Sequence, residues 1–291
     1  MEDFDFASPK TLAEALAILA SNGDRARLIA GGTDILVQMR AGRRTADVVV
    51  DVKNIPELNE VSYDSQKGLV LGAAVPCYLI YQNKQVASAY PGLIDSASLI
   101  GGIQIQGRAS IGGNLCNAAP SGDAIPPIIA LSGVCNIASS SGIRQVSAEE
   151  FCTGPGQNQL KPGEMLVSIA FPPPQAHSGT NYQRFIPRNE MDIAVAGVGS
   201  HVVLDGSGQN FVSARIALAS VAPTPVFAKD AGDSLAGKPV SEASIQEASE
   251  KAMADAKPIN DMRGTIRQRK HLIGVLTRRT LNNAVERARS N

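Results

Sequence analysis

The segment that most constrains the fold is a glycine-rich stretch near the middle of the chain, RASIGGNLCNAAPSGDAIPP, at residues 108–127. It places a Gly-Gly pair after the small hydroxyl residue Ser110, and AGGTD at residues 30–34 repeats this combination with Thr33. Glycine permits positive φ and removes the Cβ that would keep a ligand from the backbone. Consecutive free N–H groups then form a concavity that binds anions. Two such loops predict a ligand with two phosphates, gripped from both sides.

The competing interpretation is that both segments are simple tight turns. The hydroxyl neighbours and a polar continuation through Asn114, Asn117, Ser121 and Asp123 favour a binding site instead. Because a carboxylate only accepts hydrogen bonds and is repelled by phosphate, Asp123 is expected to face sugar hydroxyls. Neither loop has the lysine of a P-loop or the spacing of the GxGxxG dinucleotide fingerprint, so the predicted phosphate site is of another type.

Composition limits the class of protein. A chain of 291 residues with 44% hydrophobic and 19% charged residues predicts a globular protein of two or three domains. A formal net charge of zero argues against nucleic acid as the main partner. Four scattered cysteines and three dispersed histidines lack metal-ligand spacing, so no protein-bound metal is expected. The acidic start and the lack of a long apolar run predict a cytoplasmic protein without a membrane span.

The pattern of elements predicts a mixed α and β architecture. In the first half, a helix capped by Ser8 and ending near Gly23 is followed by strands alternating with helices, including a hairpin around 139–142. Three prolines at 172–174 suggest a domain boundary. The second half predicts a hairpin turning at 205–208, followed by two helices. The last helix carries an apolar stripe expected to pack on the hairpin sheet: Ile266, Ile273, Leu276, Leu281, Val285 and Ala288.

Excess basic charge gathers in the same region. From residue 251 onward there are ten Lys or Arg residues and three Asp or Glu residues. A solvated helix face is the favoured interpretation, and a docking surface for a partner is the alternative.

Four ordered motifs resemble one family. LIAGGTDILVQMR, ASIGGNLCNAAPSGDAIPP, PGEMLVSIAFP and YQRFIPRNEMDIA are similar to motifs of the FAD-binding medium subunit of the molybdenum hydroxylases, the xanthine dehydrogenase and aerobic carbon monoxide dehydrogenase group. The resemblance covers essentially the whole chain. It implies an α+β fold: a two-lobed FAD-binding domain of the vanillyl-alcohol oxidase type at 1–175, with lobes of about 1–55 and 56–175. A small C-terminal domain of antiparallel sheet and helices is implied at 180–291.

The resemblance also assigns cofactor-binding residues. The first loop is implied to wrap the FAD pyrophosphate through Leu28, Ile29, Ala30, Gly31, Gly32, Thr33, Asp34 and Ile35. The second loop is implied to contribute Ser110, Ile111, Gly112, Gly113, Asn114, Asn117 and Asp123. Met165 and Leu166 fall near the flavin, with core packing as the alternative. Arg184 matches a basic position near the isoalloxazine ring, where a cation would stabilise the reduced flavin. For Arg184, and for Arg188 in the same motif, a structural ion pair is the alternative.

One departure from the family pattern precedes the second loop. The family usually has IRN-x-G-T there, whereas this chain has IQGRAS, so Gln106 and Gly107 replace an Arg-Asn pair. The hydroxyl of Ser110 is kept, which predicts that phosphate binding survives. The departure leaves open the contacts that the Arg-Asn pair makes in the family, including any to a neighbouring subunit.

The function implied by the resemblance is that of one subunit of three. The chain is expected to carry FAD, to accept electrons from a small subunit with [2Fe-2S] clusters after hydroxylation at a large molybdenum-cofactor subunit, and to pass them to an external acceptor. A dimer of heterotrimers is expected. The chemistry is the flavin's own, so no side chain is assigned as catalytic acid, base or nucleophile. The alternatives are a self-contained FAD-dependent oxidoreductase and a non-enzymatic nucleotide-binding module.

Overall fold

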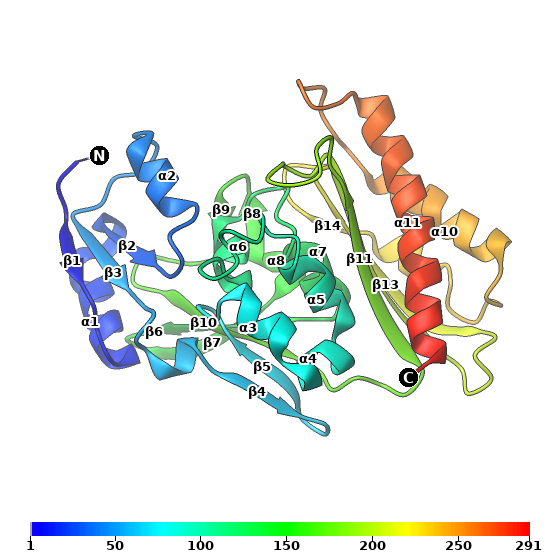
Figure 1. The fold of residues 1–291 in the computed structure, drawn as a ribbon, viewed down its shortest axis with the longest axis horizontal. Helices are drawn as coiled ribbons and strands as arrows, with labels where there is room; N and C mark the ends of the chain where they lie inside the picture. Colours follow the sequence, from blue (N-terminus) through cyan, green and yellow to red (C-terminus); the bar gives the residue numbers. More distant parts are fainter. Residues whose placement is uncertain (1) are drawn as a thin grey trace.

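The computed structural model describes residues 2–291, arranged as three sheets in a row with helices packed between and around them (Figure 1). The N-terminal sheet is parallel, in the order β1-β3-β2. Its elements are β1 (Asp5–Ala7), α1 (Leu12–Asn22), the 3₁₀ turn η1 (Gly23–Arg25), β2 (Ala26–Ile29), α2 (Ile35–Arg40) and β3 (Val48–Asp51). We refer to residues 2–55 as the N-terminal part.

The cap of the first helix differs from the prediction. Thr11, not Ser8, caps α1, and its side chain accepts a hydrogen bond from the backbone N–H of Glu14 at 3.2 Å. The Glu14 carboxylate in turn accepts from the N–H of Lys10 at 2.8 Å. This reciprocal arrangement satisfies two N–H groups at the helix start, which Ser8 lies too far upstream to do. Gly23 ends the helix, as predicted.

The central part holds an antiparallel sheet in the order β4-β5-β10-β6-β7. Its strands are β4 (Val61–Asp64), β5 (Gly68–Gly72), β6 (Val134–Ser139), β7 (Gly142–Ser147) and β10 (Met165–Phe171), with a small β8 (Cys152–Gly154) and β9 (Gln157–Asn158) pair. Its helical segments are η2 (Pro56–Leu58), α3 (Cys77–Gln82), α4 (Lys84–Ala89), α5 (Pro91–Ala97), α6 (Ile111–Asn117), α7 (Ile125–Ala130) and α8 (Ala148–Phe151). The predicted hairpin is confirmed, because Ser139 pairs with Gly142 at its turn.

The C-terminal part is an antiparallel sheet in the order β11-β12-β13-β14, covered by helices. Its elements are β11 (Ser178–Phe185), β12 (Ala196–Leu204), β13 (Phe211–Ala219), β14 (Val226–Phe227), α9 (Lys229–Asp233), α10 (Glu242–Asp255) and α11 (Ile266–Arg289). The predicted hairpin and both helices are present. Most of the α11 stripe is buried, but Ile266 is 41% exposed, because Arg269 takes the inward position at that end of the helix.

Helices cover both faces of the C-terminal sheet, and those on one face lie between it and the central part. α5 packs against β11 and α7 against β12 and β13, whereas α11 packs against β11 and β12 (Figure 1). The core under the N-terminal sheet continues into the central sheet, because Val50, Met165 and Val167 belong to one buried cluster. The C-terminal part buries a separate cluster of its own. Within residues 2–291, every helix is too short or too polar to cross a lipid bilayer.

Candidate functional site

A cavity of about 610 Å³ lies where the N-terminal and central parts meet, and both glycine loops line it. This volume is within the usual range for small-molecule and cofactor sites. Most of the predicted cofactor-binding residues line the cavity: Leu28, Ala30, Gly31, Gly32, Thr33, Asp34, Ile35, Ser110, Gly112, Gly113, Asn114, Asn117 and Leu166. The structure therefore brings together two segments that are about eighty residues apart in the sequence.

The first loop, residues 30–34, runs from the end of β2 to the start of α2. Within residues 2–291, the backbone N–H groups of Gly31, Gly32, Thr33 and Asp34 donate no hydrogen bond to protein. Gly32 adopts φ +77°, a left-handed conformation that disfavours other residues. Because an N–H group that is withdrawn from water needs another acceptor, a ligand that fills the cavity would have to accept from these groups.

The two loops touch through their backbones. A Cβ added at Gly31 would lie 1.9 Å from the carbonyl oxygen of Arg108, so only glycine fits at this crossing. The guanidinium of Arg108 donates to the carbonyl oxygen of Gly31 at 3.2 Å. The first loop is thus held against the segment that leads into the second loop.

The second loop is shaped by capping of α6. The Ser110 side chain accepts a hydrogen bond from the N–H of Gly113 at 3.0 Å, the usual N-cap arrangement. Asn114, in the first turn, uses its side-chain oxygen to accept from the N–H of Ala124 at 3.1 Å. The Ser110 hydroxyl therefore shapes the loop as an internal cap, a role that the sequence had not indicated.

Two arginines that the sequence analysis missed also line the cavity, Arg27 and Arg44. The Nε of Arg27 is buried and has no hydrogen-bond partner among residues 2–291. Arg44 donates to the side chain of Gln38 at 2.9 Å and to the carbonyl oxygen of Gly156 at 3.2 Å, and no carboxylate in the described chain pairs with it. A charged residue inside the otherwise apolar strand β2 is a signal that could have found Arg27, whereas Arg44 lies in a segment without a motif.

Asp34 adds an acidic group to the same wall. It carries the last of the four free N–H groups of the first loop and lines the cavity. Removal of the carboxyl from water by the surrounding walls raises the pKa of Asp34 above its usual value.

Three of the predicted residues lie in the core instead of the cavity wall. Ile29, Ile111 and Met165 are at most 8% exposed and pack within hydrophobic clusters. Leu166, the neighbour of Met165, does line the cavity. Alternation along β10 explains the difference, since successive side chains of a strand point to opposite faces.

Asp123 and Arg184 form a buried ion pair outside the cavity lining. The other Asp123 oxygen accepts from the hydroxyl of Tyr182 at 2.7 Å. Burial raises the pKa of Asp123, although Arg184 and Tyr182 act against that shift, and burial beside Asp123 raises the pKa of Tyr182. Both carboxylate oxygens therefore accept from protein donors, and the expected contact of Asp123 with sugar hydroxyls stays a prediction. That expectation could not include Tyr182, which is 59 residues away.

The departure at Gln106 and Gly107 has a structural role of its own. Gln106 is 2% exposed, and its side-chain nitrogen donates to the carbonyl oxygen of Ser98 at 2.8 Å. Its own carbonyl oxygen accepts from the N–H of Tyr78 at 3.2 Å. Gln106 therefore ties the segment before the second loop to α3 and to the end of α5.

Comparison with known proteins identifies the family. A family model described as the FAD binding domain in molybdopterin dehydrogenase matches residues 2–174, and the model of the CO dehydrogenase flavoprotein C-terminal domain matches residues 181–284. The chain belongs to this family. It is the FAD-binding subunit of a molybdenum hydroxylase-type oxidoreductase, with an FAD-binding domain followed by a C-terminal domain of antiparallel sheet and helices. The predicted family, fold class and FAD cofactor are confirmed.

Relatives match along nearly the whole chain. The xanthine dehydrogenase FAD-binding subunit of Escherichia coli O157:H7 is 34% identical, with 98% of each chain covered. The carbon monoxide dehydrogenase medium chain of Afipia carboxidovorans is 31% identical, with coverage of 99% of this chain and 98% of that one. A solved structure of carbon monoxide dehydrogenase from Hydrogenophaga pseudoflava superimposes with a TM-score of 0.93, at 29% identity and 98% coverage of both chains.

Proposed function

We propose that this chain is the electron outlet of a heteromeric molybdenum hydroxylase. In this proposal a large subunit oxidises the substrate at a molybdenum cofactor, and a small subunit with [2Fe-2S] clusters passes the electrons to FAD on this chain. An external acceptor then receives them. The single observation that carries the proposal is the cavity between the two glycine loops, with four free backbone N–H groups, in a chain of the FAD-subunit family.

The proposed site follows from the donors that the cavity offers. The N–H groups of residues 31–34 and the loop at 110–114 would hold the diphosphate of FAD from two sides. In the described part of the chain, the buried Nε of Arg27 has no partner and Arg44 has no carboxylate beside it, so the two cations fit an anionic ligand. When bound, FAD would supply redox chemistry that can exchange electrons singly or in pairs, and the protein would supply its placement and electrostatics.

Further contacts of the cofactor are proposed for the remaining predicted residues. We infer that Leu166 packs on the flavin end of the cavity and that Met165 supports it from the core. Arg184 is paired with Asp123 and does not line the cavity, which favours the structural ion pair over a position beside the flavin. The proposed domain boundaries stay at 1–175 and 180–291, and both fit the segments that the two family models match.

A self-contained flavin oxidoreductase is the alternative. It would need a substrate site of its own and turnover by the isolated chain. The full-length relatives are named as an FAD-binding subunit and a medium chain, which favours a chain that works within an assembly. A nucleotide-binding module without redox activity would instead purify without flavin.

Purification from the native cell tests the proposal. The tagged chain is expected to bring down two further polypeptides, one with iron–sulfur clusters and one with molybdenum, in a yellow-brown complex with one FAD per copy of this chain. Metal and flavin analysis of the purified material gives the stoichiometry. A catalytically competent assembly of this chain alone, free of iron and molybdenum, would contradict the proposed function and support the self-contained enzyme.

A further inference from the structure

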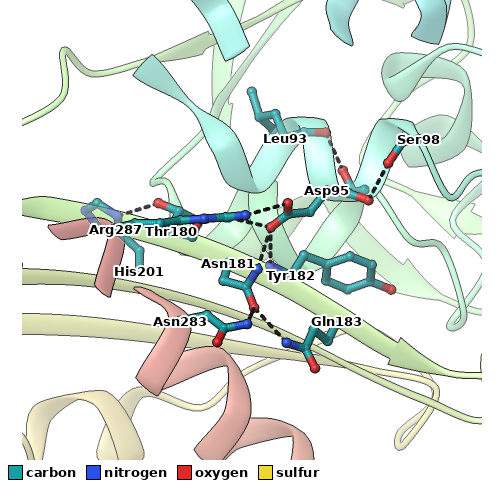
Figure 2. Close-up of polar contacts among 11 residues, drawn as sticks. Leu93, Asp95, Ser98, Thr180, Asn181, Tyr182, Gln183, His201, Asn283 and Arg287 are labelled. Carbon is teal, nitrogen blue, oxygen red and sulfur yellow. Dashed lines mark hydrogen bonds and ion pairs between the residues drawn. The ribbon is translucent and has the colours of Figure 1, made fainter. Parts of the chain in front are cut away.

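Strand β11 is an edge strand of the C-terminal sheet, and a pair of side chains covers its open edge. An edge strand leaves alternate N–H and C=O groups without a strand partner. Here the carbonyl oxygen of Thr180 accepts from Arg287 of α11 at 2.5 Å, and the N–H of Tyr182 donates to Asp95 of α5 at 3.0 Å. Figure 2 shows Arg287 and Asp95 meeting beside the strand. The two side chains take the place of a neighbouring strand.

The pair Asp95–Arg287 links three elements, because Asp95 lies on α5, Arg287 lies on α11, and both bind β11. Arg287 and Asp95 form a bidentate ion pair, with nitrogen–oxygen distances of 2.6 and 2.9 Å. Asp95 also accepts from the side chain of Asn181 at 2.7 Å (Figure 2). Asp95 lies on the FAD-binding domain, whereas Arg287 lies on the last helix of the C-terminal domain. The pair therefore fixes where β11 lies along α5.

The position of β11 along α5 decides which side chains reach Asp123. Tyr182 and Arg184 lie two residues apart on β11, so they share one face, and each binds a different oxygen of Asp123. A shift of one residue, about 3.4 Å, would turn this face away. Asp123 precedes Ala124, whose N–H donates to Asn114 in the cavity wall. A continuous set of bonds thus connects Asp95 with the proposed FAD site.

We infer that Asp95 and Arg287 are positioning residues for the FAD site, acting through Tyr182, Asp123 and Asn114. This inference rests on the proposed function, because it takes the 610 Å³ cavity to be the FAD site. Neither residue touches the cavity. Their effect on the cofactor is transmitted by the placement of β11 against the second glycine loop.

The matched control is another ion pair between the two domains. Arg215 of β13 binds Glu149 of α8, and the two side chains are 28% and 31% exposed, similar to the 34% and 19% of Arg287 and Asp95. This control pair has no bond to β11. Glu149→Gln therefore weakens domain contact without affecting the route from Asp95 to Asn114.

The test compares Asp95→Asn, Arg287→Gln and Glu149→Gln in the full chain. FAD affinity is measured by titrating the flavin-free protein, and the visible circular dichroism of the bound flavin reports its surroundings. Hydrogen exchange at the N–H of Tyr182 reports the edge contact without any cofactor. For Asp95→Asn we expect faster exchange at Tyr182, a dissociation constant raised about three- to tenfold, and an altered flavin spectrum.

Arg287→Gln keeps Asp95 as acceptor and is expected to act in the same direction with a smaller effect. Glu149→Gln is expected to keep the wild-type spectrum, affinity and exchange. Equal effects of all three variants would overturn the inference, because a general docking role would then explain them. Unchanged affinity and spectrum in Asp95→Asn would also overturn it, while the proposed function stands. Wild-type protein without affinity for FAD would overturn the proposed function itself, and this inference with it.

Discussion

At the scale of single residues, the crossing of the two glycine loops depends on the absence of one atom. Gly31 lies so close to Arg108 that a Cβ would meet its carbonyl oxygen at 1.9 Å, and backbone cannot move aside as a flexible side chain can. The free N–H groups of the first loop begin at the same residue. Gly31 therefore contributes both to the contact between the loops and to the proposed phosphate site.

Gly31→Ala is expected to raise the dissociation constant of FAD by about tenfold or more, equivalent to 1.4 kcal/mol, because the loops must separate. Fluorescence titration of the flavin-free protein measures it. Gly107→Ala is the control, since a Cβ there meets nothing within 4 Å. Wild-type affinity in Gly31→Ala would refute the proposed role of the crossing.

His201 gives a second residue-scale prediction, on stability. Burial and the charge of Arg215 lower its pKa from 6.5 to about 4, so the folded protein holds the neutral ring. The neutral ring shares a 2.7 Å hydrogen bond with Thr180. Because the folded pKa lies below the unfolded one, the stability that this group contributes is complete above pH 6.5 and is lost as the pH falls towards 4.

Between pH 7 and pH 5, the free energy of unfolding of the wild type should therefore fall about 2 kcal/mol further than that of His201→Gln. Urea unfolding at both pH values measures the difference, since the carboxylates contribute equally to the two proteins. Parallel losses in the two proteins would show that His201 titrates normally.

At the scale of elements, local chemistry determined what the sequence could predict. The hairpin at 139–142 and the last two helices follow from turn residues and apolar spacing, which act between near neighbours. The predicted apolar stripe of α11 was wrong only at Ile266. Arg269 is buried at that end of the helix instead, because it binds partners far away in the chain. Sequence periodicity carries no information about such partners.

Arg269 links α11 by hydrogen bonds to the residues next to the ends of β12 and β13. Its side chain is 5% exposed, binds Asp261 at 2.7 and 2.8 Å, and donates to the carbonyl oxygens of Val195 and Ser220. Arg269→Gln is expected to lower the free energy of unfolding by about 3 kcal/mol, because it leaves Asp261 and these carbonyls without their donor. Chemical denaturation measures it. Arg267→Gln, at an exposed neighbouring position, should be close to wild type, and an equal loss in both variants would contradict this assignment.

At the scale of the whole molecule, the site is formed by parts that fold from distant segments. The glycine pairs predicted both loops of the cavity, because each loop needs small residues at its own positions in the sequence. Arg27 and Arg44 could not be found in this way, since they reach the cavity through tertiary contacts. The partners of Asp123, which lie outside the cavity, could not be found for the same reason. The FAD-binding domain and the C-terminal domain are then held together by α5, α7 and the pair Asp95–Arg287.

The most direct test of the central claim is a crystal structure of this chain, alone or in its complex, with FAD bound. The account predicts the diphosphate between the N–H groups of residues 31–34 and the loop at 110–114, with Arg27 or Arg44 within hydrogen-bond distance of an oxygen of the dinucleotide. A structure in which both loops face solvent while the dinucleotide occupies another part of the chain would contradict it.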